Sequence, residues 1–161
     1  MKSSIIKKPS IILVDDHLIF RQGLKSLITF DNLGTVIGEA ADGKEFLKLL
    51  TPPIPDLIFM DIDMPNMNGM EAAEKALSMI PELKIIVFSM FGDEEYFNKM
   101  IDIGVKGFIL KSSGITDVEQ AISDVMQDKK YFSSVLPNNN LNRFNSQNDS
   151  DQDPQVPIPW W

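Results

Sequence analysis

Residues 57–69 limit the fold of this chain more tightly than any other stretch. They begin with four large apolar residues, Leu57 to Met60, which are typical of a strand buried on both faces of a sheet. The run ends at Asp61, and the Pro-, Asn- and Gly-rich segment after it predicts a turn. Ligands of open α/β sheets bind beside the carboxyl ends of the strands, so Asp61 is a candidate reactive group. Asp is also a common turn residue, so its role depends on the polar residues that accompany it.

Four more short apolar runs, at residues 10–14, 35–40, 84–89 and 105–110, also predict strands. Segments with apolar residues at helical spacing separate them, and a last one covers residues 115–126. Strands that alternate with helices at such spacings pair in parallel through right-handed crossovers. The sequence therefore predicts an α/β fold, a doubly wound five-stranded parallel sheet with helices on both faces.

Polar residues follow four of these predicted strands, at the point where each strand ends. Besides Asp61 they are Asp15, Asp16, Ser89 and Lys111. A doubly wound sheet brings such ends to one edge, where three carboxylates need a cation, and Mg²⁺ suits oxygen ligands. With the ammonium of Lys111 and the hydroxyl of Ser89, this set predicts a site that holds a phosphoryl group while a carboxylate attacks it.

Composition sets the class of protein and its domain limits. The formal net charge of −8 argues against a nucleic-acid surface on this chain, and the absence of Cys excludes disulfides and thiolate chemistry. No apolar stretch approaches the ~20 residues of a membrane span, so we expect a cytoplasmic protein with no membrane partner. We predict an N-terminal extension at residues 1–9, a domain at 10–133, and a linker and disordered tail at 134–161, which ends in Trp160 and Trp161.

The ordered set of motifs resembles the receiver domain of two-component response regulators. It comprises Val14-Asp15-Asp16-His17, Met60-Asp61-Ile62-Asp63-Met64-Pro65 with Gly69, Ser89, and Phe108-Ile109-Leu110-Lys111. Arg21-Gln22-Gly23-Leu24 and Gly104-Val105-Lys106-Gly107-Phe108 are similar to the NarL/FixJ (LuxR-type) subgroup. The resemblance covers residues 10–133 and implies a flavodoxin/CheY-like fold.

The same resemblance implies a role for each site residue. Asp61 would be the phosphoacceptor, Lys111 would pair with phosphoryl oxygens, and Ser89 with Phe108 would form the switch. The implied Mg²⁺ ligands are Asp16, Asp61 and the backbone carbonyl of Asp63, which bind directly, and Asp15, which binds largely through water. The implied chemistry is self-phosphorylation and self-dephosphorylation only, so the domain would signal and would not be an enzyme in the usual sense.

The implied partners are a sensor histidine kinase or phosphotransfer protein, and a second copy of the chain after phosphorylation. DNA would be bound only through an output domain that this chain lacks. Two alternatives stay open: a haloacid-dehalogenase-like phosphatase that uses Asp61 and Asp63, and a stand-alone phosphorelay interaction protein. His17, the only histidine, suits a helix cap or packing at the rim better than catalysis.

Overall fold

The computed structural model describes residues 8–90 and 94–132. The predicted extension before residue 8 and the predicted tail lie outside these residues. The strands are β1 (Ser10–Val14), β2 (Thr35–Ala40), β3 (Leu57–Asp61), β4 (Ile85–Ser89), β5 (Gly107–Leu110) and β6 (Tyr131–Phe132). The helices are α1 (Leu18–Phe30), α2 (Gly43–Lys48), α3 (Gly69–Met79), α4 (Glu94–Ile103) and α5 (Ile115–Met126).

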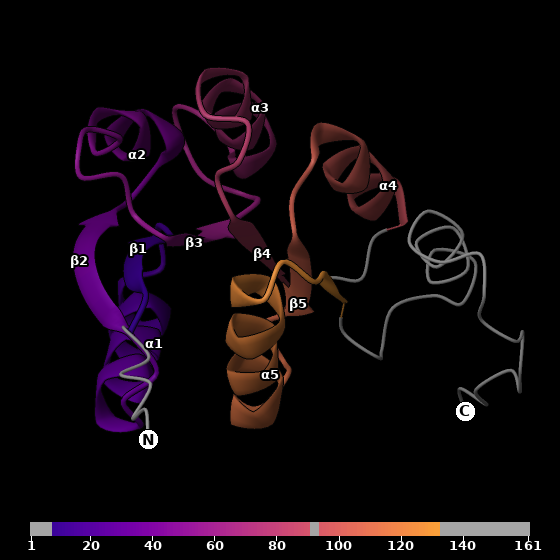
Figure 1. Ribbon diagram of the computed structural model, residues 1–161. Coiled ribbons are helices and arrows are strands. Elements are labelled where there is room, and N and C mark those ends of the chain that lie inside the picture. Colours follow the sequence, from indigo (N-terminus) through magenta and orange to yellow (C-terminus); the bar gives the residue numbers. More distant parts are fainter. Residues whose placement is uncertain (1–7, 91–93, 133–161) are drawn as a thin grey trace, which may run out of the picture.

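The strands form one parallel sheet in the order β2-β1-β3-β4-β5-β6. Helices α2, α3 and α4 cover one face and α1 and α5 cover the other, as Figure 1 shows. The predicted doubly wound α/β fold is therefore confirmed. The count of five strands needs a small correction, because Tyr131 and Phe132 add a short sixth strand at the edge beside β5.

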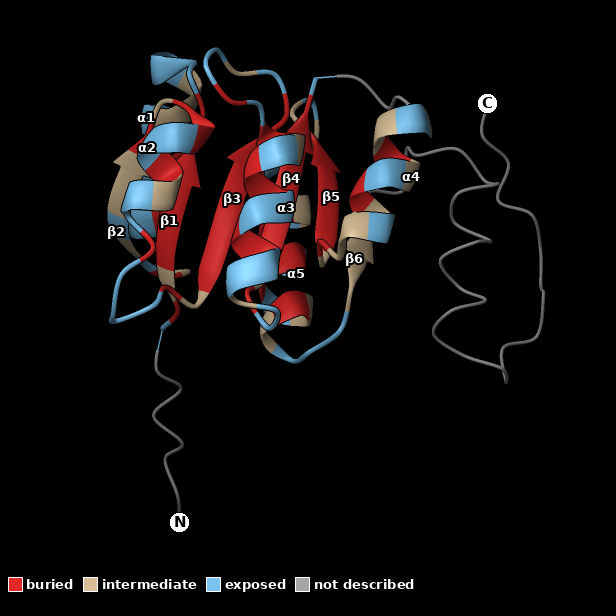
Figure 2. Ribbon diagram, turned by 90° about the horizontal axis from the view of Figure 1, so that it is seen from above, coloured by how far each residue is buried: buried red, intermediate tan, exposed pale blue. Residues whose placement is uncertain are grey.

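The core lies on both sides of the central strands, which Figure 2 shows as buried along their length. Every residue of β3 is buried, as expected for a continuous apolar run in the middle of a parallel sheet. Burying one such Leu, Ile, Phe or Met side chain is worth about 1.5–3 kcal/mol. The helices present matching stripes: Leu24 and Ile28 of α1 are buried against one face, and Phe97 and Met100 of α4 against the other.

The strand register places the first two acids beside each other. Val14 of β1 pairs with Met60 of β3, so the next residues, Asp15 after β1 and Asp61 at the end of β3, lie side by side. Ser89 pairs with Leu110, and the backbone N–H of Lys111 donates to the carbonyl of Ser89 at 2.7 Å. The topology thus gathers residues from both ends of the domain at one edge.

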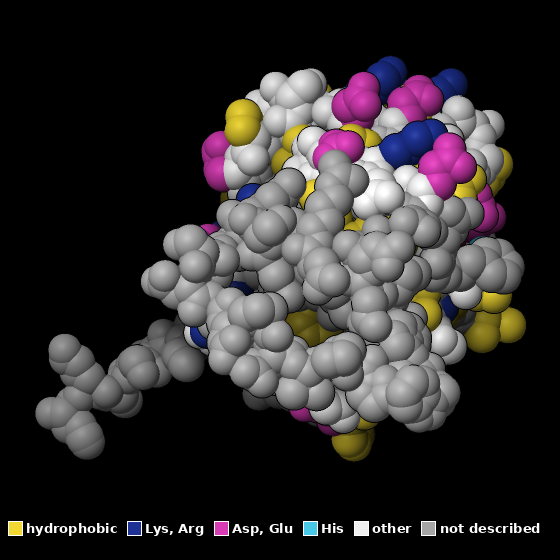
Figure 3. All heavy atoms as spheres, turned by 90° about the vertical axis from the view of Figure 1, so that its right-hand side faces the viewer, with side chains coloured by type: hydrophobic (Ala, Val, Ile, Leu, Met, Phe, Trp, Pro, Cys, Tyr) yellow, Lys and Arg dark blue, Asp and Glu magenta, His cyan; other side chains and the backbone are white. Residues whose placement is uncertain are grey.

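The surface that the described residues form on the side of α4 mixes acidic and basic side chains, as Figure 3 shows. One pair on this helix is Glu95 with Lys99, whose charged atoms lie 3.1 Å apart. Within residues 8–90 and 94–132, no helix combines the length and apolar character needed to cross a membrane.

Candidate functional site

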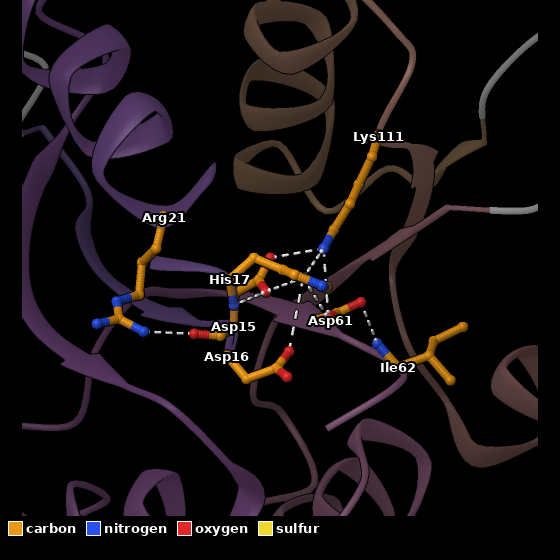
Figure 4. Close-up of polar contacts among 7 residues, drawn as sticks. All are labelled: Asp15, Asp16, His17, Arg21, Asp61, Ile62 and Lys111. Carbon is orange, nitrogen blue, oxygen red and sulfur yellow. Dashed lines mark hydrogen bonds and ion pairs between the residues drawn. The ribbon is translucent and has the colours of Figure 1, made fainter. Parts of the chain in front are cut away.

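Two acids and a lysine meet at the carboxyl ends of β1, β3 and β5. Lys111 Nζ lies 2.8 Å from Asp15 Oδ2 and 3.3 Å from Asp61 Oδ2, and all three side chains are almost fully buried. Figure 4 shows them pointing toward one another. The convergence that the sequence predicts is present, and it is a desolvated one, where charge interactions are stronger than in water.

Asp61 is the most perturbed acid of this group. It is 3 % exposed, and one of its oxygens, Oδ1, accepts a hydrogen bond from the N–H of Ile62 at 2.8 Å. Burial, with the negative charge of Asp15 beside it, raises the pKa of Asp61 to about 6, and the positive charge of Lys111 opposes the rise only in part. A carboxyl with this pKa is mostly ionised at pH 7 and takes up its proton as the pH falls through about 6, and a pKa displaced in this way is typical of functional sites.

A pocket of about 360 Å³ opens beside Asp61. Its lining includes Asp16, Asp63, Ser89 and Met90. Ser89 is buried, whereas Met90 is 59 % exposed and Asp63 is also exposed. A hydroxyl and two further carboxylates therefore line the same pocket as Asp61, together with exposed side chains at its rim.

Phe108 lies in the sheet interior and not in this pocket. It is fully buried on β5, and its ring meets that of Phe97 of α4 edge to face at a centroid distance of 5.4 Å. The ring of Phe97 in turn contacts Phe132 of β6 at 4.9 Å. A movement of the Phe108 ring would therefore affect α4 and β6 first.

His17 is closer to the acids than the sequence suggests. It occupies the cap position of α1, but its side chain makes no capping hydrogen bond. Instead its Nδ1 atom lies 3.0 Å from Asp15 Oδ1, 3.5 Å from Asp16 Oδ1 and 3.7 Å from Asp61 Oδ2. Of the two predicted roles, His17 holds the backbone cap position without a side-chain cap, and its ring lies at the rim of the pocket.

Arg21 is a site residue whose role the sequence does not reveal. Its guanidinium donates to the backbone carbonyl of Asp15 through Nη1, and its Nε donates to Glu39 Oε1 at 3.0 Å. The carboxylate of Glu39 also pairs with Lys25 at 3.0 Å. Arg21 therefore holds the loop that contains Asp15 against the end of β2. The only sequence signal for this role is that Arg21 lies one helical turn after His17.

The turn after Asp61 is held from two sides. The N–H of Gly69 donates to the carbonyl of Ile62 at 2.7 Å, and a Cβ atom on Gly69 would lie 1.9 Å from the carbonyl oxygen of Asp61. Asn66, which has a positive φ of 64°, donates through its amide to Asp42 at 2.7 Å. Asp42 in turn caps α2 by accepting from the N–H of Glu45. These contacts fix the turn that follows Asp61 and therefore the position of its side chain.

The oxygen atoms suit a hard divalent cation. Ligand atoms of Asp15, Asp16, His17 and Asp61 all lie within 4.8 Å of one another. Asp15 Oδ2 and Asp61 Oδ2 are buried, and their cationic neighbour is Lys111, at 2.8 and 3.3 Å. The single positive charge of Lys111 does not balance three carboxylates, and carboxylate oxygens are what Mg²⁺ prefers. The residues therefore fit the predicted ion.

A parallel sheet with an acid cluster at its strand ends is compatible with a receiver domain and with a haloacid-dehalogenase-like phosphatase, so comparison with known proteins decides between them. The model of the response regulator receiver domain matches residues 11–123. The oxygen regulatory protein NreC of Staphylococcus epidermidis is 33 % identical over 143 residues, 88 % of this chain and 66 % of that protein. The chain belongs to the response regulator receiver domain family.

Solved structures agree. A LuxR-family two-component response regulator from Aurantimonas sp. SI85-9A1 aligns with a TM-score of 0.79 and 28 % identity, over 86 % of this chain and 99 % of that one. CheY of Borrelia burgdorferi, in a complex with CheX, BeF₃ and Mg²⁺, aligns with a TM-score of 0.70 and 26 % identity, over 74 % and 90 % of the two chains.

The comparisons confirm the predicted receiver domain and its likeness to LuxR-type regulators, and they do not favour a haloacid-dehalogenase-like phosphatase. The family is one of signalling proteins and not of conventional enzymes. The chain spans 58–66 % of the length of the first curated relatives it matches.

Proposed function

We propose that Asp61 accepts a phosphoryl group from a sensor histidine kinase or phosphotransfer protein, with Mg²⁺ bound beside it. The observation that carries this proposal is the buried contact of Lys111 Nζ with both Asp15 and Asp61, at 2.8 and 3.3 Å. A lysine and clustered carboxylates around one nucleophilic oxygen are what in-line phosphoryl transfer requires.

In the proposed step an ionised oxygen of Asp61 attacks phosphorus and forms a P–O bond. The bond from phosphorus to the donor breaks, and the leaving group keeps that electron pair and takes a proton from water. Lys111 would hold the ammonium against the phosphoryl oxygens, and Ser89 would add a hydroxyl from the neighbouring strand. The product is an acyl phosphate on Asp61, which water later cleaves.

Mg²⁺ would be held by Asp15, Asp16 and Asp61, with the backbone carbonyl of Asp63 as a further ligand. When bound, the ion supplies the positive charge that offsets the phosphoryl oxygens. The same three acids repel one another without it, which supports a cation at this place. The reaction is assigned to the cytoplasm, as the family resemblance implies.

We propose that phosphorylation changes the output through Ser89 and Phe108. Ser89 would move toward the phosphoryl group, and Phe108 would respond behind it. Because Phe108 contacts Phe97 of α4, which contacts Phe132 of β6, the affected surface would include α4 and β6, and the outcome would be a change in self-association or partner binding. Contact with DNA would be made by an output domain, as in a transcription regulator, and not by this receiver.

The proposed chemistry is tested by incubating the chain with acetyl phosphate and Mg²⁺ and recording the intact mass. We expect wild type to gain one phosphoryl group and Asp61→Asn to gain none. Asp31→Asn, at an exposed carboxylate beyond the far end of α1, is the matched control and should gain one. Phosphorylation of Asp61→Asn at wild-type rate would refute the assignment.

A second arm tests the output. Size-exclusion chromatography with light scattering of the same samples reports self-association, and we expect a change in wild type that Asp61→Asn does not show. Chelation of Mg²⁺ before acetyl phosphate is added should abolish both the mass gain and the change in association.

A further inference from the structure

The imidazole of His17 lies at the point where the three acids converge. Its Nδ1 atom is within 3.0–3.7 Å of oxygens from Asp15, Asp16 and Asp61. Figure 4 shows the ring at the centre of the dashed contacts, between Lys111 and the carboxylates. Any cation that these three acids share must therefore either take Nδ1 as a ligand or displace the ring.

The ring is also turned for ligation. Nδ1 lies 3.1 Å from Lys111 Nζ. An ammonium can only donate, so in this contact Nδ1 accepts from Lys111, and a cation that takes Nδ1 as a ligand must displace the ammonium from it. The backbone holds this arrangement, because the N–H of His17 donates to Asp15 Oδ1 at 2.8 Å. The side chain is 55 % exposed, so the ring has room to move.

Cations differ in their affinity for an imidazole nitrogen. Mg²⁺ favours carboxylates, carbonyls and water, whereas Zn²⁺, Co²⁺ and Ni²⁺ bind imidazole well. For a borderline ion such as Zn²⁺, the ligand set is three carboxylate oxygens and one imidazole nitrogen. For Mg²⁺, the ligand set is the three oxygens alone, and the ring obstructs the site.

We propose that His17 sets the metal preference of this site: its Nδ1 atom ligates Zn²⁺ and related transition ions and favours them over Mg²⁺. The inference rests on the proposed function, since it assumes a divalent cation among these acids. It adds a selectivity-determining residue that contributes nothing to the phosphoryl chemistry itself.

The affinity test uses calorimetric titration of the tag-free full chain with Zn²⁺ and, separately, Mg²⁺. We expect His17→Ala to weaken Zn²⁺ binding about ten-fold or more, in the range that loss of a supporting group costs metal sites, and to leave Mg²⁺ binding unchanged or tighter. Leu18→Ala, which shortens an exposed neighbour that offers no ligand atom, is the matched control and should behave as wild type. His17→Gln keeps most of the volume and should resemble His17→Ala.

A direct readout avoids mutation. The chain has one histidine, so ¹⁵N NMR of the wild type shows a single imidazole. Zn²⁺ should shift its Nδ1 resonance strongly and Mg²⁺ should not.

The outcomes separate the two proposals. If both ions bind wild type, but the ratio of their affinities is the same in His17→Ala and Nδ1 does not respond to Zn²⁺, the selectivity proposal is wrong and the proposed function stands. If neither ion binds wild type, the metal part of the proposed function fails together with this inference.

Discussion

At the scale of single residues, Asp61 owes its pKa of about 6 first to burial and then to the charge of Asp15. A divalent cation would reverse this balance, because a positive charge at contact distance favours the ionised carboxylate. We therefore expect the carboxyl carbon of Asp61, followed by ¹³C NMR, to titrate near pH 6 without Mg²⁺ and below about pH 4 with saturating Mg²⁺. A titration that Mg²⁺ leaves unmoved would contradict a metal at this place.

The same pKa makes Asp61 a destabilising residue at neutral pH. The folded protein binds this proton more tightly than the unfolded chain does, because the pKa rises from 3.8 to about 6 on folding. Asp61 therefore adds stability below about pH 4, and that contribution is lost as the pH rises through about 6.

We predict that Asp61→Asn, which removes the charge and keeps the shape, is more stable than wild type at pH 7.5. The gain is up to about 3 kcal/mol, from roughly two pKa units at 1.36 kcal/mol each. It should shrink toward pH 4, where wild type is protonated, and Mg²⁺ should reduce it at pH 7.5 by stabilising wild type. Urea unfolding at both pH values measures it, and Asp31→Asn should show no such gain. If wild type and Asp61→Asn are equally stable at pH 7.5, the prediction is wrong, and other interactions offset the cost of burying the ionised carboxylate.

At the scale of elements, the sequence predicts β1 to β5 well because each is a short apolar run with a polar end, and it predicts α2 from the Asp42 cap. It misses β6 because Tyr131 and Phe132 are too short to show alternation, and they pair only because β5 offers a free edge. The site is predicted because strand ends share an edge, whereas the inward turn of the His17 ring depends on tertiary contacts that no spacing encodes.

Gly69 connects β3 to α3 at a place where no side chain fits. A Cβ atom there would overlap the backbone carbonyl of Asp61 at 1.9 Å, and a backbone atom in a sheet cannot yield cheaply. We predict that Gly69→Ala destabilises the fold by about 3 kcal/mol, the upper part of the usual range for overpacking, and slows phosphorylation by shifting Asp61.

The matched control is Gly23→Ala in α1. Nothing lies within 4 Å of a Cβ atom at Gly23, which is exposed in the helix interior. There Ala should stabilise the fold by about 0.5–1 kcal/mol, because it restricts the unfolded chain and favours helix. Urea midpoints that shift in the same direction for both variants would contradict the steric argument.

At the scale of the whole molecule, we propose that residues 10–133 form the folding unit, with β6 as its last element. One ring contact and two hydrogen bonds join β6 to the rest: the Phe132 ring lies 4.9 Å from that of Phe97, the Tyr131 hydroxyl donates to Asp117, and the Tyr131 N–H donates to the carbonyl of Lys106 at 3.0 Å. These contacts link the edge strand to α4, α5 and the segment before β5.

Two truncations test this boundary. A chain that ends at residue 133 keeps all three contacts, so its free energy of unfolding should match that of the full chain. A chain that ends at residue 130 loses them, and we expect it to be about 3 kcal/mol less stable, from roughly 1 for the ring pair and roughly 1 for each hydrogen bond. It should also respond less to phosphorylation at α4, because Phe97 would lose one of the two rings that hold it. Urea unfolding and the association assay compare the three chains, and a 133-residue form much weaker than the full chain would place part of the core contacts in residues 134–161.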